Sequence, residues 1–101
     1  MTDKYKLKYS IAFYNDFDEI ISYIKYELKN EIAAMNLINK VEKAITRRIK
    51  NPMGYEKYKT RAGNVYYKIY INNFVIFYTM SENTMEVRRM IYNKREITKL
   101  I

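Results

Sequence analysis

Apolar residues recur with two different spacings along this chain, and the change of spacing separates strands from helices. From Tyr5 to Ile11 apolar residues alternate with Lys6, Lys8 and Ser10, which predicts a half-buried β-strand. From residue 13 onwards they recur every three or four residues, as on one side of an amphipathic helix. The positions of this stripe are Phe13, Phe17, Ile20, Ile21, Ile24 and Leu28. We expect Ser10 to be the N-cap of this helix.

A second stripe with helical spacing follows the short polar link at residues 29–31. Its positions are Ala34, Leu37, Ile38, Val41, Ile45 and Ile49. We expect this helix to end at Asn51, because Pro52 disfavours helical backbone geometry in the residue before it. Two helices joined by so short a link predict an antiparallel helical hairpin.

The segment 65–95 contains three β-rich runs separated by two polar turns, which predicts a meander. Asn72 and Asn73 suit the first turn, because asparagine tolerates the positive φ angles that a tight hairpin requires. The middle run, 74–80, is apolar at successive positions, so we expect it at the centre of the sheet. The last run is expected to alternate strictly. One face would carry Val87, Arg89 and Ile91, and the other Arg88, Met90 and Tyr92.

Residues 53–64 contain both glycines and are expected to form a loop or an irregular strand. The whole chain, residues 1–101, is then a small single α+β domain with the element order β-α-α-β-β-β. Its helical hairpin packs on one face of an antiparallel sheet. Because the hairpin covers only that face, the other face must be lined by the remaining Tyr, Lys and Arg side chains. We expect it to be a concave, basic, aromatic surface.

The amino-acid composition excludes several kinds of chemistry. The chain has no cysteine and no histidine, so disulfide bonds and a cysteine nucleophile are excluded, and zinc would have only carboxylate ligands. Asp16, Asp18 and Glu19 are explained by the attraction of the helix dipole for anions, rather than by a metal site. Phosphate-binding loops and metal-binding patterns are absent, so we expect no metal and no cofactor.

The sequence also predicts the compartment. No apolar run approaches the ~20 residues needed to span a bilayer. Charged residues stand within positions 1–8, where a signal peptide has its apolar region. We therefore expect a cytoplasmic protein with no membrane partner.

The net charge of +8 is concentrated in two regions. Residues 40–61 contain eight Lys or Arg against two Glu, and residues 88–101 contain five against one. Such regions bind polyanions with release of counterions, or bind an acidic protein partner. The candidate nucleic-acid-binding residues are Arg47, Arg48, Lys50, Lys57, Lys59, Arg61, Arg88, Arg89 and Lys94. The helix dipole also accounts for part of the group at 47–50, and the cations at 57–61 also suit an exposed strand.

Several short motifs occur in the order of the predicted elements. They are Asp16-Phe-Asp-Glu-Ile20-Ile-Ser-Tyr23-Ile24 in the first helix, Asn51-Pro52-Met53-Gly54 after the second, Tyr67-Lys68-Ile69 and Val75-Ile76-Phe77-Tyr78 in the meander, and Val87 to Arg95 at its end. In combination they resemble the RelE/ParE superfamily of bacterial toxins, over essentially the whole chain. The resemblance implies the toxin of a type II toxin–antitoxin pair, held inactive by a cognate antitoxin protein.

The resemblance leaves two mechanisms open. RelE-like members cut messenger RNA on the ribosome, and for them the matching catalytic residues are Lys68 and Arg95, with Tyr92 where related nucleases have a histidine. Tyr70, Val75 and Ile101 stand where that branch has a lysine, an arginine and a tyrosine. ParE-like members poison DNA gyrase and carry out no chemistry on nucleic acid.

Between these, the sequence favours ribosome-associated mRNA cleavage by a metal-independent endoribonuclease whose site is Lys68, Tyr92 and Arg95. One alternative is a ParE-like DNA gyrase inhibitor without catalytic activity. A further alternative is a basic RNA-binding module. The partners would be the antitoxin together with the ribosome and mRNA, or the antitoxin together with DNA gyrase.

Overall fold

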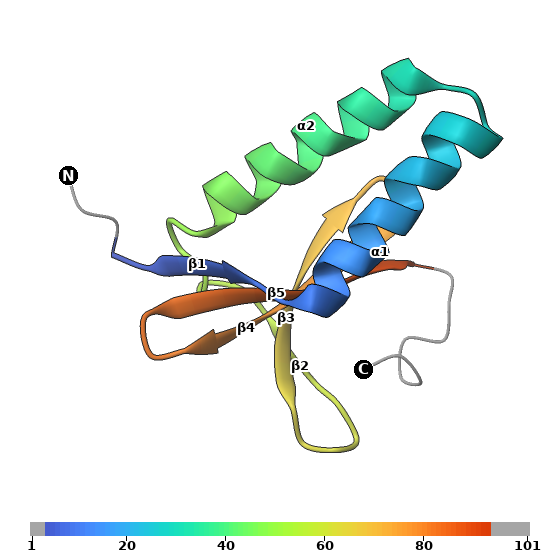
Figure 1. Cartoon of the computed structure of the whole chain (residues 1–101). Helices are drawn as coiled ribbons and strands as arrows, with labels where there is room; N and C mark the ends of the chain where they lie inside the picture. The colour runs from blue at the N-terminus through green and yellow to red at the C-terminus, as the bar shows by residue number, and fades with distance from the viewer. Residues whose placement is uncertain (1–3, 94–101) are drawn as a thin grey trace.

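A computed structural model describes residues 4–93 of the chain, so the candidates Lys94 and Arg95 lie outside the described residues. The elements are β1 (Lys6–Tyr9), α1 (Ile11–Ser22), a π-helical turn η1 (Tyr23–Glu27), α2 (Glu31–Arg48), β2 (Lys57–Lys59), β3 (Val65–Ile71), β4 (Phe74–Ser81) and β5 (Thr84–Tyr92). The strands form one sheet in the order β1-β5-β4-β3-β2. Figure 1 shows α1 and α2 side by side on one side of this sheet. The predicted α+β class, with a helical hairpin on one face, is confirmed.

The sheet differs from the prediction at both edges. At one edge, the segment expected to be a loop or an irregular strand contributes β2, which pairs antiparallel with β3. At the other edge, β1 pairs parallel with β5, so the sheet is mixed rather than wholly antiparallel. The parallel pairing is allowed because the helices and three strands intervene between β1 and β5, whereas a tight hairpin would require antiparallel strands.

Side-chain caps fix where both helices begin. The hydroxyl of Ser10 accepts a hydrogen bond from the backbone N–H of Phe13 at 3.1 Å, which confirms the predicted N-cap. The cap ends the strand at Tyr9, so Ile11 is the first helical residue and is 79% exposed instead of belonging to the strand. Asn30 caps α2 in the same way, through the N–H of Ala33 at 3.0 Å.

The main hydrophobic core lies between the sheet and the two helices. Its buried members on the helices are Phe13, Leu37, Val41 and Ile45, and those on the strands include Tyr67, Ile69, Ile76, Tyr78, Met85, Val87 and Met90. Val75 and Phe77 are also fully buried, but they belong to a second cluster with Tyr66 and Ile91. Strand β4 is therefore apolar on both faces, as the sequence predicts for a central strand.

A β-bulge interrupts the expected alternation in β5. Val87 pairs with Tyr78 and Arg89 pairs with Phe77, so Arg88 is an extra residue between two successive pairs. Val87 and Met90 consequently both belong to the core beneath the helices, while Ile91 belongs to the second cluster. The prediction that Val87 and Ile91 share a face was wrong for this reason.

The helices are too short or too polar to form a membrane span. Within residues 4–93, no helix combines the length and the apolar character that crossing a bilayer requires.

Candidate functional site

The sheet face opposite the helices, which we name the open face, carries most of the polar strand residues. Alternation along each strand assigns it these side chains: Lys6, Lys8, Tyr58, Tyr66, Lys68, Tyr70, Val75, Phe77, Glu86, Arg89 and Ile91. The open face therefore combines cations with aromatic rings, as the sequence predicts.

Lys68 belongs to the aromatic cluster at the centre of the open face. Its Nζ atom lies 4.1 Å from the centre of the Tyr58 ring and 5.9 Å from that of Phe77. The rings of Tyr58 and Tyr66 lie 6.0 and 5.9 Å from Phe77. An ammonium group over aromatic faces gains cation–π attraction, so this contact holds Lys68 down on the sheet.

The two candidate catalytic residues within the described chain lie on opposite faces of the sheet. Lys68 pairs with Phe77, whose side chain is in the open-face cluster. Tyr92 pairs with Phe74 and their rings lie 5.8 Å apart, and Phe74 packs against the core beneath the helices. The backbone of the sheet therefore separates Lys68 from Tyr92, and the structure does not bring this pair together.

Asp16 and Arg89 form the most enclosed ion pair of residues 4–93. Oδ2 of Asp16 accepts from Nε of Arg89 at 2.6 Å, and Oδ1 accepts from Nη2 at 3.2 Å. The hydrogen bond to Asp16 is the main cause that raises the pKa of Arg89 above its ordinary value. Asp16 also accepts from the backbone N–H of Met90 at 3.0 Å, at the part of β5 that extends past β1.

This ion pair corrects the explanation of Asp16 by the helix dipole. The first turn of α1 contains no acidic residue, and Asp16 lies beyond it. The dipole effect falls off within the first turn, so the carboxylate is held by Arg89 and by the edge of β5 instead. Arg89 is thereby engaged inside the fold, although the sequence suggested it for nucleic-acid binding.

Arg48 is also engaged inside the fold. Its Nη1 donates to the carbonyl oxygen of Lys68 at 2.8 Å and to the hydroxyl of Tyr78 at 3.0 Å. Its guanidinium stacks 3.5 Å from the centre of the Tyr55 ring. The Tyr78 hydroxyl in turn donates to the carbonyl of Pro52 at 2.6 Å. Arg48 therefore ties the end of α2 to the sheet, which a count of basic residues could not predict.

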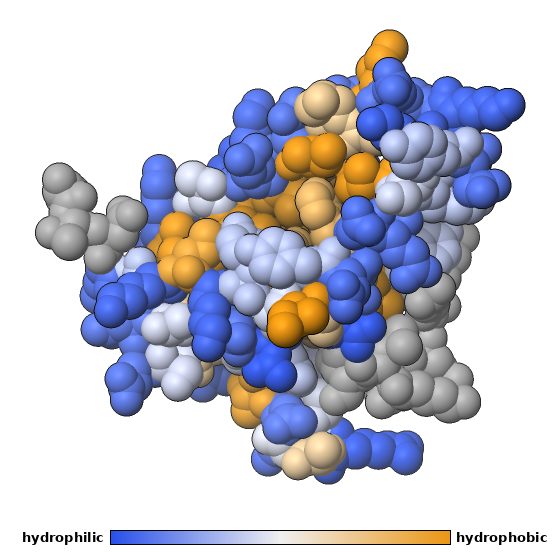
Figure 2. All heavy atoms as spheres, in the orientation of Figure 1, coloured by the Kyte–Doolittle hydropathy of each residue, from blue (hydrophilic) through white to orange (hydrophobic). Residues whose placement is uncertain are grey.

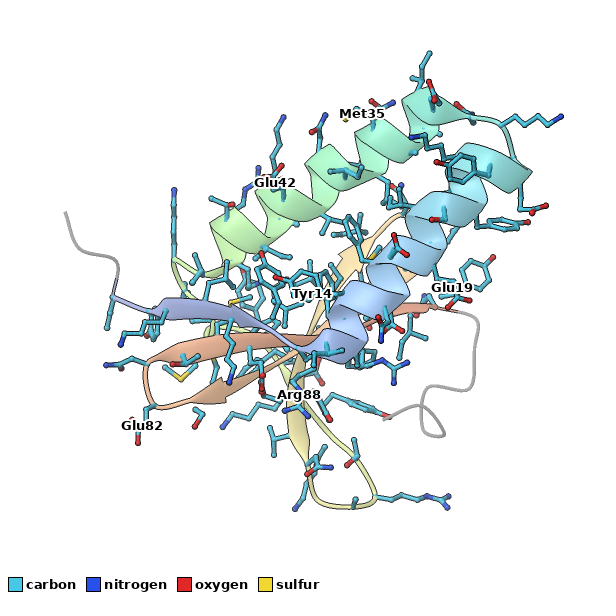
Figure 3. The ribbon with its side chains drawn as sticks, in the orientation of Figure 1. Tyr14, Glu19, Met35, Glu42, Glu82 and Arg88 are labelled. Atoms are coloured by element: carbon cyan, nitrogen blue, oxygen red, sulfur yellow. The ribbon has the colours of Figure 1, made fainter. Side chains whose placement is uncertain are left out.

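A groove between α1 and α2 is a feature that the sequence analysis missed. It has a volume of about 230 Å³ and is lined by Tyr9, Phe13, Tyr14, Phe17, Ile38, Val41, Glu42 and Ile45. Tyr14 and Met35, from facing helices, are each 57% exposed (Figure 3). Figure 2 shows apolar residues gathered along the line between the two helices. The signal in the sequence was Tyr14, an apolar residue that lies outside the stripe of the first helix and lines the groove.

Comparison with known proteins adds the family. Residues 7–96 match the family model described as the ParE toxin of the type II toxin–antitoxin system parDE. The chain belongs to this family of toxins. A comparison with curated proteins finds no match.

Two solved structures share the fold of this toxin. A structure of the chromosomal ParDE toxin–antitoxin system from P. aeruginosa has a TM-score of 0.66 and 12% identity, covering 90% of this chain and 98% of that one. The RelB–RelE antitoxin–toxin complex from Methanococcus jannaschii has a TM-score of 0.51 and 18% identity, covering 93% and 98%. Both structures belong to toxin–antitoxin systems.

The remaining candidate cations of the toxin lie on separate surfaces. Arg47 is exposed on α2, on the side away from its buried stripe, and Lys50 is exposed in the turn that follows the helix. Lys57, Lys59 and Arg61 are exposed on the hairpin that joins β2 to β3. Arg88, at the β-bulge below the start of α1 in Figure 3, donates to Glu86 at 3.0 Å. The structure therefore does not gather the candidate nucleic-acid-binding residues of the described chain into one patch.

The toxin should lose stability in alkali. Burial raises the pKa of Tyr78 and of Tyr9 above the ordinary value of 10.0. Because both phenols ionise more readily in the unfolded chain, their contribution is complete below pH 10 and is lost as the pH rises through the folded pKa values. Thermal denaturation between about pH 8 and about pH 11 should show a melting temperature that is flat and then falls. The fall should be shallower in Tyr78→Phe than in wild type, and an equal fall in the two proteins would contradict the assignment to Tyr78.

Proposed function

We propose that this toxin stops growth by inhibiting DNA gyrase and carries out no chemistry on RNA. The observation that carries the proposal is the placement of Lys68 and Tyr92 on opposite faces of the sheet. Attack of a ribose 2′-hydroxyl on its phosphate needs a base, an acid and a cation around one phosphate. A pair separated by the sheet backbone cannot surround one phosphate. The match to the ParE family model favours the same mechanism.

The contact of Lys68 with the ring of Tyr58 supports this proposal. The Nζ atom lies 4.1 Å from the centre of that ring, where cation–π attraction holds the side chain against the sheet. This contact supports a packing role for Lys68 on the open face.

Lys68→Ala is accordingly expected to leave growth arrest intact. Brief induction of wild type or Lys68→Ala should produce chromosomal breaks from trapped gyrase–DNA complexes, with no new transcript ends. Purified protein of either kind should inhibit DNA supercoiling by gyrase. New transcript ends without chromosomal breaks, together with growth restored by Lys68→Ala plus Arg95→Ala, would instead establish mRNA cleavage. Binding to RNA with neither effect on cells would indicate the binding module.

We further propose that a small acidic antitoxin keeps this toxin inactive. Two kinds of surface suit such a partner. The groove between α1 and α2 is lined mostly by apolar side chains, among them Tyr14, which is 57% exposed, and contiguous exposed apolar surface marks protein contacts. The cations of the open face suit an acidic segment, added as a strand or as a helix.

Copurification tests the antitoxin proposal. The product of the neighbouring gene should copurify with tagged wild-type toxin when the two genes are expressed together. Tyr14→Ser should weaken the complex, while the matched control Tyr26→Ser, at a similarly exposed tyrosine of η1 that lines neither the groove nor the open face, should affect it less. Equal loss in the two variants would contradict a contact at the groove.

A further inference from the structure

The outward side of α2 carries a row of cations that the proposed function does not use. Lys43, Arg47 and Lys50, which we name the α2 basic row, are exposed and follow one another by four and three residues. This spacing places Lys43 and Arg47 on one side of α2, and Lys50 follows them in the turn directly after Arg48, the last helical residue. The buried side of α2, with Ala34, Leu37, Val41 and Ile45, faces the core. Figure 1 shows α2 at the outer margin of the fold, with its far side away from the sheet.

A shallow hollow on the surface collects all three cations. It has a volume of about 340 Å³ and is lined by Glu42, Lys43, Thr46, Arg47 and Lys50. Glu42 also lines the groove between the helices, so it lies at the border between the two hollows. The hollow contains no apolar side chain that could anchor a protein partner, and protein interfaces depend on such anchors. Phosphate contacts need only cations and polar groups.

Unlike Lys8, Arg88 and Arg89, the cations of the α2 basic row lie in no ion pair in the described part of the chain, and the acidic residue that lines their hollow is Glu42. Lys8 and Arg88 both approach Glu86, and Arg89 is paired with Asp16. Within residues 4–93, none of the three cations of the row forms an ion pair. Like charges four residues apart on a helix repel each other, so the row destabilises the free protein slightly. A polyanion that binds there would relieve this repulsion.

We propose that the α2 basic row binds the phosphate backbone of duplex DNA. The inference rests on the proposed function, because DNA is the substrate that gyrase holds when the toxin meets it. Seven residues at the helical rise correspond to about 10 Å, which approximates the span from Lys43 to Lys50 because Lys50 lies just after the end of α2. Each strand of the duplex has one phosphate per about 3.4 Å of its axis, so a row laid along that axis covers the rise of about three phosphates. The toxin would thus hold gyrase and its DNA together, with α2 against the DNA.

Fluorescence anisotropy with a labelled duplex of about 30 base pairs tests this inference. Each neutralised phosphate contributes about −0.9 to the slope of log K against log salt, so three contacts predict a slope of about −2.7. The triple variant Lys43→Gln, Arg47→Gln, Lys50→Gln should lose most of that slope. The matched control is Lys57→Gln, Arg61→Gln and Lys59→Gln on the β2–β3 hairpin, which removes the same residue types and the same charge. It should keep a slope close to that of wild type.

Several outcomes would overturn the assignment. Equal losses in the two triple variants would show that only net charge matters. Displacement of the duplex by polyglutamate at equal charge concentration would point to an acidic protein, and tighter binding to RNA than to duplex DNA would point to RNA. Circular dichroism of each variant should match wild type, because all six side chains are exposed.

Gyrase supercoiling assays on the same proteins separate this inference from the proposed function. If wild-type toxin inhibits gyrase but binds no DNA, the inference of DNA binding is wrong and the proposed function is unaffected. If the toxin binds DNA through the α2 basic row but does not inhibit gyrase, the proposed function is wrong and the inference of DNA binding is unaffected.

Discussion

Phe77→Ala is expected to destabilise the toxin by about 3–5 kcal/mol, the largest effect of any substitution considered. Phe77 is fully buried although its side chain points away from both helices. It packs between the rings of Tyr58 and Tyr66, so its removal leaves a cavity lined by aromatic groups. Small domains have total stabilities of about 5–15 kcal/mol, so the loss is a large fraction of the whole. Urea unfolding followed by circular dichroism measures it.

Tyr70→Ala is the matched control for Phe77→Ala. Tyr70 also points to the open face, on the neighbouring strand, but is 63% exposed. It should cost well under the value for Phe77, of the order of 1 kcal/mol or less. Similar losses for the two variants would mean that the open-face cluster is not a second core, and would weaken the assignment of Lys68 to packing.

Local patterns in the sequence predicted the elements whose cause is local. The helical stripes, the cap at Ser10 and the turn at Asn72 depend on residues within a few positions of one another, and the structure has all of them; Asn72 adopts a φ of 53°. The apolar run of β4 predicted its central place for a similar reason, because a strand with two apolar faces must be covered on both.

Features that depend on distant residues were not predictable in this way. The β-bulge at Arg88 follows from the register of β5 against β4, and no local pattern marks it. β2 is a strand only because β3 lies beside it. The number of cations could be read from the sequence, but which of them are free to bind a ligand could not. Arg48 and Arg89 are held by groups 20 to 73 residues away, while Arg47 and Lys50 remain on the surface.

This difference in availability changes which surface deserves a functional assignment. The sequence placed function on the open face, where basic and aromatic residues coincide. In the structure, the cations of that face are largely engaged by Glu86, Asp16 and the ring of Tyr58. Within the described residues, exposed cations without an ion pair remain on the β2–β3 hairpin and in the α2 basic row, and those of the row line a common hollow where one polyanion can contact all three. Burial of the open-face rings further means that few of them are free to stack on bases.

Asp16→Ala is expected to cost about 2–3 kcal/mol, because one carboxylate serves three donors on β5. Its removal leaves the guanidinium of Arg89, which is only 27% exposed, without this partner, and the N–H of Met90 without its acceptor. Loss of one member of a fully buried pair costs about 3–5 kcal/mol, and partial exposure lowers that figure. The melting temperature should fall by about 10 °C in a domain of this size.

The position of Asp16 explains why Asp16→Ala should also destabilise β5 next to the β-bulge. β1 pairs only with residues 84–87 of β5, so the edge of β5 beyond the bulge depends on α1 for a partner. Hydrogen exchange of the Met90 amide should therefore accelerate more than that of amides in β4. Asp18→Ala, two residues along the same helix at an exposed position, removes the same charge and should change neither measurement. Equal destabilisation by Asp18→Ala would return the explanation to the helix dipole, which acts on both carboxylates alike.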